Sequence, residues 1–135
     1  MKKSLLIAVD FDGTVVEDRY PAIGKPMPFA IETLKMLQAD GHRLILWTYR
    51  HGKKLDEAVE FLKKKGIPPY AVNRSYPEEP SHPSDVSRKI HADLFIDDRN
   101  FGGFPGWGVI YQELSGSKEP PNSGSRGLWA RLCGG

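Results

Sequence analysis

Three short apolar runs constrain the fold of this chain more than any other feature of its sequence. They lie within residues 5–9, 44–47 and 93–96, and none shows the polar alternation of a half-exposed strand. Apolar runs of this length are typical of strands that are buried on both faces, as in a parallel sheet covered by helices. We therefore expect these segments to form the centre of a mainly parallel sheet.

Amphipathic helices are predicted in the two intervals between these strands. Apolar residues recur on one face of residues 29–40, with Gly41 behind them, and again over residues 55–65, with Gly66 behind them. A glycine just past the last apolar position is a common helix end. The order strand, helix, strand, helix, strand predicts an α/β domain of three layers, in which right-handed crossovers place helices on both faces of the sheet.

The other segments carry weaker patterns. Residues 15–28 lack a clear period, and their prolines disfavour a long helix. The remaining predictions are a short strand at 70–72, a short helix at 84–90 and a last strand at 109–111, which follows a glycine-rich loop. From residue 115 the composition shifts to Ser, Gly, Pro and Lys, so we expect one folded domain over 1–114 and a flexible tail over 115–135.

Charge and cysteine content narrow the class of protein. The 19 Lys and Arg nearly balance the 17 Asp and Glu, so the net charge of +2 provides no broad basic field for nucleic acid. The single cysteine, Cys133, excludes an intrachain disulfide and a zinc site of the Cys₄ or Cys₂His₂ type. The longest apolar run, at residues 5–9, is too short to cross a membrane. We expect a cytoplasmic protein with no membrane partner.

Each of the three predicted strands ends in polar side chains. Asp10 and Asp12 follow the first strand, Thr48 the second, and Asp97 with Asp98 the third. Because the carboxyl ends of parallel strands meet at one edge of a sheet, these groups are expected to converge. Carboxylates crowded in this way repel one another unless a divalent cation lies between them. A site made only of oxygen ligands favours Mg²⁺ over zinc.

The spacing after the first strand suits two carboxylates with different roles. Alternate residues leaving a strand point the same way, so Asp10 and Asp12 face the crevice while Phe11 turns toward the core. Gly13 allows a sharp turn that brings backbone N–H groups toward an anion. One carboxylate can then stay ionised as nucleophile and metal ligand, while the other carries a proton.

These segments resemble the four motifs of the haloacid dehalogenase superfamily of phosphohydrolases, in the family order. The segment Asp10-Phe11-Asp12-Gly13-Thr14 resembles the first motif, and the apolar strand ending at Thr48 resembles the second. Lys89 is positioned like the lysine of the third motif, and the apolar strand ending in Asp97-Asp98 resembles the fourth. The resemblance covers residues 5–98, and the first motif is its most specific part.

The resemblance implies a Rossmann-like fold and a two-step, Mg²⁺-dependent hydrolysis of phosphomonoesters. Asp10 would form an aspartyl-phosphate, and Asp12 would protonate the leaving oxygen and then deprotonate the attacking water. The implied metal ligands are Asp10, the backbone carbonyl of Asp12, and Asp97, with Asp98 supporting the water shell. Thr48 and Lys89 would contact the transferring phosphoryl group, whose developing charge such groups stabilise.

The sequence leaves two interpretations open for several side chains near these motifs. Arg50 either holds a substrate anion by a bidentate contact or pairs with an acidic residue of the site. Arg88 competes with its neighbour Lys89 for the contact to phosphate. Three aromatic residues are expected mainly in the core, with a wall of the substrate pocket as the alternative: Phe101, Phe104 and Trp107. The scattered histidines are interpreted as ordinary surface or hydrogen-bonded side chains: His42, His82 and His91.

The intervals between the motifs are too short for an inserted cap domain, so the chain resembles capless members of the superfamily. Such members tend to act on macromolecular phosphates or to use a neighbouring subunit as a lid, which makes a homo-oligomer one expectation. The segments 20–28 and 68–83 are candidates for a partial rim instead. The substrate is expected to be a phosphorylated small molecule or a macromolecular phosphate.

Two other functions compete with a hydrolase. Response-regulator receivers, which are phosphoacceptor signalling modules, also combine acidic residues, a hydroxyl and a lysine on a parallel α/β sheet. Their acidic pair and acceptor aspartate lie on different strands, whereas Asp10 and Asp12 share one turn here. A non-catalytic module that binds metal or phosphate is the other alternative, and the presence of every expected catalytic residue type disfavours it.

Overall fold

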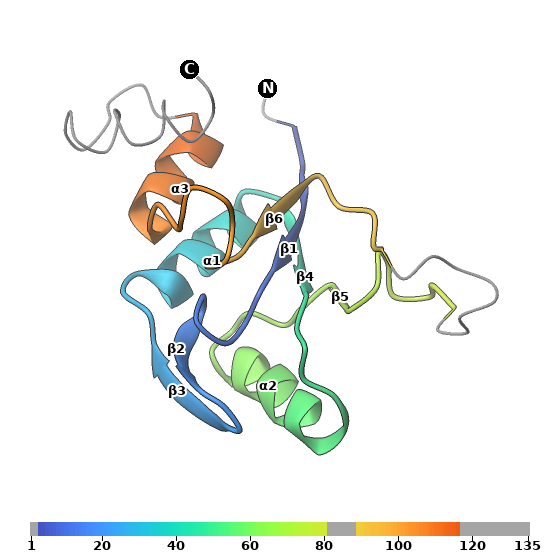
Figure 1. Ribbon diagram of the computed structural model, residues 1–135. Coiled ribbons are helices and arrows are strands. Elements are labelled where there is room, and N and C mark those ends of the chain that lie inside the picture. Colours follow the sequence, from blue (N-terminus) through green and yellow to red (C-terminus); the bar gives the residue numbers. More distant parts are fainter. Residues whose placement is uncertain (1–2, 81–88, 117–135) are drawn as a thin grey trace.

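A computed structural model describes residues 3–80 and 89–116 of the chain (Figure 1). The elements, in chain order, are β1 (Leu6–Val9), β2 (Val16–Arg19), β3 (Ala22–Pro26), α1 (Ala30–Ala39), β4 (Arg43–Leu46), α2 (Gly52–Lys64), β5 (Ala71–Val72), β6 (Leu94–Ile96) and α3 (Trp107–Ser115). The three main predicted strands, the helices at 29–40 and 55–65 and the short strand at 70–72 are therefore confirmed, with small changes of boundary.

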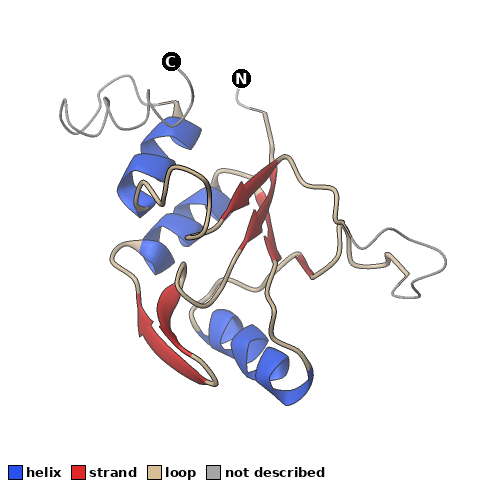
Figure 2. Ribbon diagram, viewed as in Figure 1, coloured by secondary structure: helices blue, strands red, loops and turns tan. Residues whose placement is uncertain are grey.

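The central sheet has the strand order β5-β4-β1-β6, and all of its neighbouring strands are parallel (Figure 2). At its centre, Ala8 of β1 lies opposite Ile45 of β4 on one side and Phe95 of β6 on the other. The chain moves outward from β1 through β4 to β5 and then returns to the other side of β1. This order confirms an α/β, Rossmann-like domain with a mainly parallel sheet, and it places the topological switch beside β1.

One face of the sheet carries the main core. Buried side chains of β1, β4 and β6 pack there with residues of all three described helices, among them Leu37 of α1, Leu62 of α2 and Ile110 of α3. The opposite face has a smaller cluster that contains Ala8, Ile45 and Ile90. The short helix expected at 84–90 falls mainly outside the described residues. A helical layer on the second face stays a prediction.

The strand expected at 109–111 is wrong, because these residues belong to helix α3. Trp107, Ile110 and Leu114 lie three and four positions apart, which places them on one face of a helix. Trp107 and Ile110 are buried in the main core, and Leu114 packs against it. A run of only three apolar residues does not distinguish strand from helix, and the longer period decides it.

An antiparallel hairpin, β2–β3, occupies the segment for which no element was predicted. Val16 pairs with Pro26 and Arg19 pairs with Ala22, with a register irregularity between them. The hairpin and α1 are the elements between β1 and β4, so this interval holds no inserted domain. The hairpin follows the turn after β1 directly, and it therefore lies at the edge of the sheet where the predicted site residues gather (Figure 1).

Helix α3 continues to Ser115, and Gly116 follows in the left-handed conformation, so the described fold extends slightly past the predicted boundary at 114. The remainder of the predicted tail, 117–135, lies outside the described residues. Among the helices that the structure describes, none is long and apolar enough to cross a membrane.

Candidate functional site

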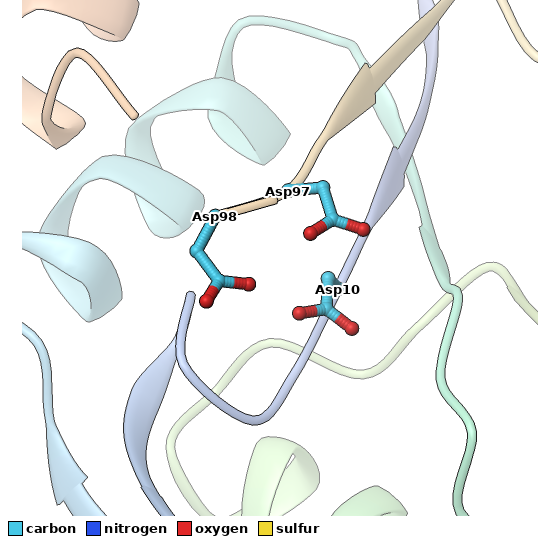
Figure 3. Close-up of side chains that lie close together, drawn as sticks. All are labelled: Asp10, Asp97 and Asp98. Carbon is cyan, nitrogen blue, oxygen red and sulfur yellow. The ribbon is translucent and has the colours of Figure 1, made fainter. Parts of the chain in front are cut away.

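The loops that leave β1 and β6 bring three predicted metal ligands together. The N–H of Asp10 donates to the carbonyl of Ile96 at 2.9 Å, which keeps the ends of the two strands side by side. Carboxylate oxygens of Asp10, Asp97 and Asp98 all lie within 4.8 Å of one another. Figure 3 shows the three side chains around one shared space. Such a group of half-buried oxygens fits the ligand preference of Mg²⁺.

Thr14 connects the turn after β1 to the end of β6. Its buried Oγ1 lies 3.1 Å from Oδ2 of Asp10 and 3.2 Å from Oδ1 of Asp98, and it accepts the backbone N–H of Asp98 at 3.0 Å. The Thr14 carbonyl in turn accepts the indole N–H of Trp107 at 2.8 Å. A hydroxyl has one proton to donate, so only one of the two carboxylates receives it at a time. No separate role for Thr14 was predicted from the sequence.

Position 13 favours glycine because the backbone there lies close to the carboxylate of Asp98. The φ of +88° at Gly13 lies in the left-handed region, and a Cβ at this position would stand 2.6 Å from Oδ2 of Asp98. Any other residue would displace Asp98 from the shared space. This is the structural reason for a glycine in the predicted turn.

Burial and neighbouring charges act together on Asp10. Burial, with the nearby charges of Asp97 and Asp98, raises the pKa of its carboxyl from 3.8 to about 7. The hydrogen bond from Thr14 acts in the opposite direction. A cation between the carboxylates would offset the part of this shift that comes from their mutual repulsion.

We expect Asp10→Asn to stabilise the chelator-treated protein at pH 8. The unfolded chain loses the Asp10 proton near the ordinary pKa of 3.8 and the folded chain near 7. The folded state therefore binds the extra proton, and the stability of the parent protein falls as pH rises between these values. Because the carboxylate is only partly buried, we expect a gain of about 1–2 kcal/mol at pH 8 and a smaller one near pH 5.

Urea unfolding of the two proteins at both pH values measures this gain. Asp56→Asn is the matched control, since Asp56 is exposed on α2 and away from the carboxylate group. A gain for Asp10→Asn that does not grow with pH would contradict the proposed cause.

Asp12 points its carboxylate at Arg50 and not at the three clustered carboxylates. Arg50 donates from Nε to Oδ2 and from Nη2 to Oδ1 of Asp12, both at 2.7 Å. The side chain of Arg50 is fully buried, and that of Asp12 is 17% exposed. Of the two interpretations of Arg50, the ion pair is therefore the one found. The structure shows its donors paired with acceptors of the protein, and its assignment as a phosphate-binding residue stays a prediction.

Thr48 is held from two sides at the end of β4. Its backbone N–H donates to Oδ1 of Asn73 at 2.8 Å, and its hydroxyl oxygen accepts the backbone N–H of Arg50 at 3.1 Å. The hydroxyl proton of Thr48 is left to donate to a ligand. Asn73 has a φ of 53°, a conformation that asparagine tolerates better than most residues. Asn73 was not predicted as a site residue, although its position directly after the predicted strand at 70–72 is a signal for one.

A cavity of about 370 Å³ opens beside these groups and is lined by Asp10, Asp12, Thr48, Arg50 and Asp97. Its outer wall adds four residues that the site prediction did not include: Asp18, Tyr20, Tyr49 and Arg99. Tyr20, in the hairpin turn, is the one residue of the segment 20–28 that lines this cavity, so the rim at 20–28 stays a prediction. None of the described residues at 68–80 lines this cavity.

The other predicted residues fall outside this cavity. Lys89 is exposed and is not among the cavity-lining residues, and its competitor Arg88 lies outside the described part of the chain. Phe101 is fully exposed, so its expected core role is wrong, whereas Trp107 is buried with Phe104 against it. His42 is buried, with Nδ1 accepting the Leu5 N–H and no hydrogen-bond partner at Nε2 among the described residues. The structure thus shows it neither at the surface nor fully hydrogen-bonded. His91 is exposed, as expected, and His82 lies outside the described residues.

Comparison with known proteins places the chain beside one solved structure. No family model and no curated protein matches it. A structure described as that of a conserved protein from Bacteroides thetaiotaomicron is 56% identical, with a TM-score of 0.79, and the match covers 87% of this chain and 94% of that chain. The description assigns that protein no activity. At this identity and coverage, the chain belongs to the same family as the conserved Bacteroides thetaiotaomicron protein.

Proposed function

We propose that the protein is a Mg²⁺-dependent phosphomonoester hydrolase of the capless haloacid dehalogenase type, with Asp10 as its nucleophile. The observation that carries this proposal is the meeting of Asp10, Asp97 and Asp98 within 4.8 Å at the carboxyl edge of a parallel sheet. Asp12 and Thr48 line the same cavity. The resemblance assigns these five residues to phosphoryl transfer, and they come from three separate strand ends. Lys89, the other residue that it assigns, does not line the cavity.

The chain supplies the covalent steps of the reaction. A carboxylate oxygen of Asp10 attacks phosphorus, and the bond from phosphorus to the leaving oxygen breaks as that oxygen takes a proton from Asp12. Water then attacks the phosphorus of the aspartyl-phosphate and gives a proton to Asp12, which restores Asp10 and releases phosphate. Thr48 donates its remaining proton to a phosphoryl oxygen.

The residues that would hold the metal are those that the resemblance names: the carboxylates of Asp10 and Asp97 and the backbone carbonyl of Asp12. Asp98 completes the acidic group. When bound, Mg²⁺ would supply positive charge for the phosphoryl oxygens. The side-chain carboxylate of Asp12 is not one of these ligands, because it faces Arg50. It keeps the proton-transfer role.

The size of the cavity favours a small phosphorylated molecule over a macromolecular phosphate. About 370 Å³ is at the lower end of small-molecule sites. Its wall carries the carboxylate of Asp18 and the hydroxyls of Tyr20 and Tyr49, with Arg99 as a further cation. Hydroxyl-bearing leaving groups can hydrogen-bond to such a wall.

The function is tested by a panel of phosphorylated sugars, nucleotides, oligonucleotides and peptides, assayed for phosphate release with Mg²⁺. We expect sustained release from one or more of the small molecules. Asp12→Asn should lower that rate by about 10²–10⁴-fold, as loss of a positioned acid–base group does. Absence of release from every member of the panel, with and without Mg²⁺, would reject the hydrolase.

A further inference from the structure

We infer that Arg50 is a positioning residue that orients the Asp12 carboxylate and fixes it to the hairpin β2–β3. The inference rests on the proposed function, because it assigns Arg50 a role in the step that Asp12 performs. It excludes the alternative in which Arg50 binds the substrate anion.

The hydrogen bonds of Arg50 carry the argument. A guanidinium group has five N–H donors. Two of them reach the two oxygens of Asp12 at 2.7 Å. The remaining contacts are to backbone carbonyls, namely Pro21 at 3.2 Å, Ala22 at 3.0 Å and Lys54 at 3.5 Å. Each donor therefore has an acceptor within the chain, and none is left for a ligand.

Stacking restrains the same group from two sides. The guanidinium carbon of Arg50 lies 5.3 Å from the ring centroid of Phe11 and 5.1 Å from that of Tyr20. Phe11 is fully buried in the core, whereas Tyr20 is 46% exposed and lines the cavity. Arg50 thus connects the core, the Asp12 carboxylate and the cavity wall.

This arrangement matters for proton transfer because Asp12 lies in a turn, and its side chain has rotatable bonds that the turn does not restrain. A bidentate contact with a planar guanidinium fixes the plane of the carboxylate as well as its distance. Each carboxylate oxygen keeps a further lone pair for the transferred proton. The carbonyls of Pro21 and Ala22 hold the hairpin turn to the same guanidinium, so that the cavity wall and the proton-transfer group move together.

Arg50→Lys tests the inference, because lysine keeps the charge but loses the planar pair of donors. With p-nitrophenyl phosphate and Mg²⁺, we expect kcat to fall by about 10–100-fold while KM changes by less than about 3-fold, as a misplacement of about 1 Å would cause. Arg43→Lys is the matched control, since Arg43 is exposed on β4 and its guanidinium contacts Tyr70, which does not line the cavity. It should leave both constants unchanged.

A double-mutant comparison separates positioning from a purely structural role. In the Asp12→Asn background, Arg50→Lys should cause little further loss of kcat, because its effect passes through Asp12. An equal loss in both backgrounds would overturn the inference. So would a large rise in KM with kcat unchanged, which would make Arg50 a substrate-binding residue.

Folding of the variants is checked by circular dichroism. If Arg50→Lys does not fold, Arg50→Ala with millimolar guanidinium replaces it, and recovery of kcat on adding guanidinium supports the inference. Unfolding of both variants, or a folded Arg50→Ala that guanidinium does not rescue, would overturn it. An inactive parent protein contradicts the proposed function and this inference together, whereas an active parent with an unaffected Arg50→Lys contradicts only this inference.

Discussion

Asp10→Asn is expected to lower the turnover of phosphate esters by about 10⁴-fold or more, the scale of loss seen when a catalytic nucleophile is removed. The amide keeps the size of the side chain but cannot form an aspartyl-phosphate. It also removes one oxygen ligand from the group formed with Asp97 and Asp98. Phosphate release under single-turnover and steady-state conditions measures the loss.

The control for this substitution is Asp56→Asn, which removes an exposed carboxylate on α2 and should leave turnover unchanged. Because Asp10→Asn is also expected to stabilise the metal-free fold at pH 8, a loss of activity cannot be explained by unfolding. Turnover within about 10-fold of the parent would mean that Asp10 is not the nucleophile.

Removal of Mg²⁺ is expected to lower turnover by about 10³-fold, because a bound cation stabilises the transferring phosphoryl group by several kcal/mol. Asp97→Asn should raise the Mg²⁺ concentration needed for half-maximal turnover by about 10–100-fold, while the fold stays intact. Protons compete with the cation at Asp10, whose pKa in the metal-free protein is about 7. Mg²⁺ affinity is therefore expected to rise between pH 6 and pH 8.

The dependence on metal is measured by titrating chelator-treated protein with Mg²⁺ and following both phosphate release and the midpoint of thermal unfolding. Mg²⁺ should raise the midpoint of the parent protein and of Asp56→Asn, and raise that of Asp97→Asn much less. Equal rates of hydrolysis in chelator-treated and Mg²⁺-loaded protein would show that the metal has no role.

The part of the site that lies at strand ends could be predicted from the sequence. β1, β4 and β6 are short, mainly apolar runs that end in polar residues, a pattern that favours strands of a parallel sheet, and parallel strands bring their carboxyl ends to one edge. Asp10, Asp97 and Asp98 consequently meet as expected. Their convergence requires only the order of the strands, not the packing of individual side chains.

The parts that depend on tertiary contacts could not be predicted in this way. The pairing of Arg50 with Asp12 spans 38 positions and depends on how the turn after β4 approaches the turn after β1. Asn73 contacts Thr48 only because β5 lies beside β4. The hairpin β2–β3 lacks a regular alternation of apolar and polar residues, so its strands could not be predicted from the sequence.

The central claim, a phosphorylated Asp10 that turns over, is tested most directly by mass spectrometry of the intact protein after reaction with a small phosphoryl donor and Mg²⁺. We predict that the Asp12→Asn variant gains the mass of one phosphoryl group, that peptide mapping places it on Asp10, and that the parent releases phosphate continuously. Stoichiometric labelling at another residue, without turnover in the parent protein, would contradict the account and indicate a phosphoacceptor module.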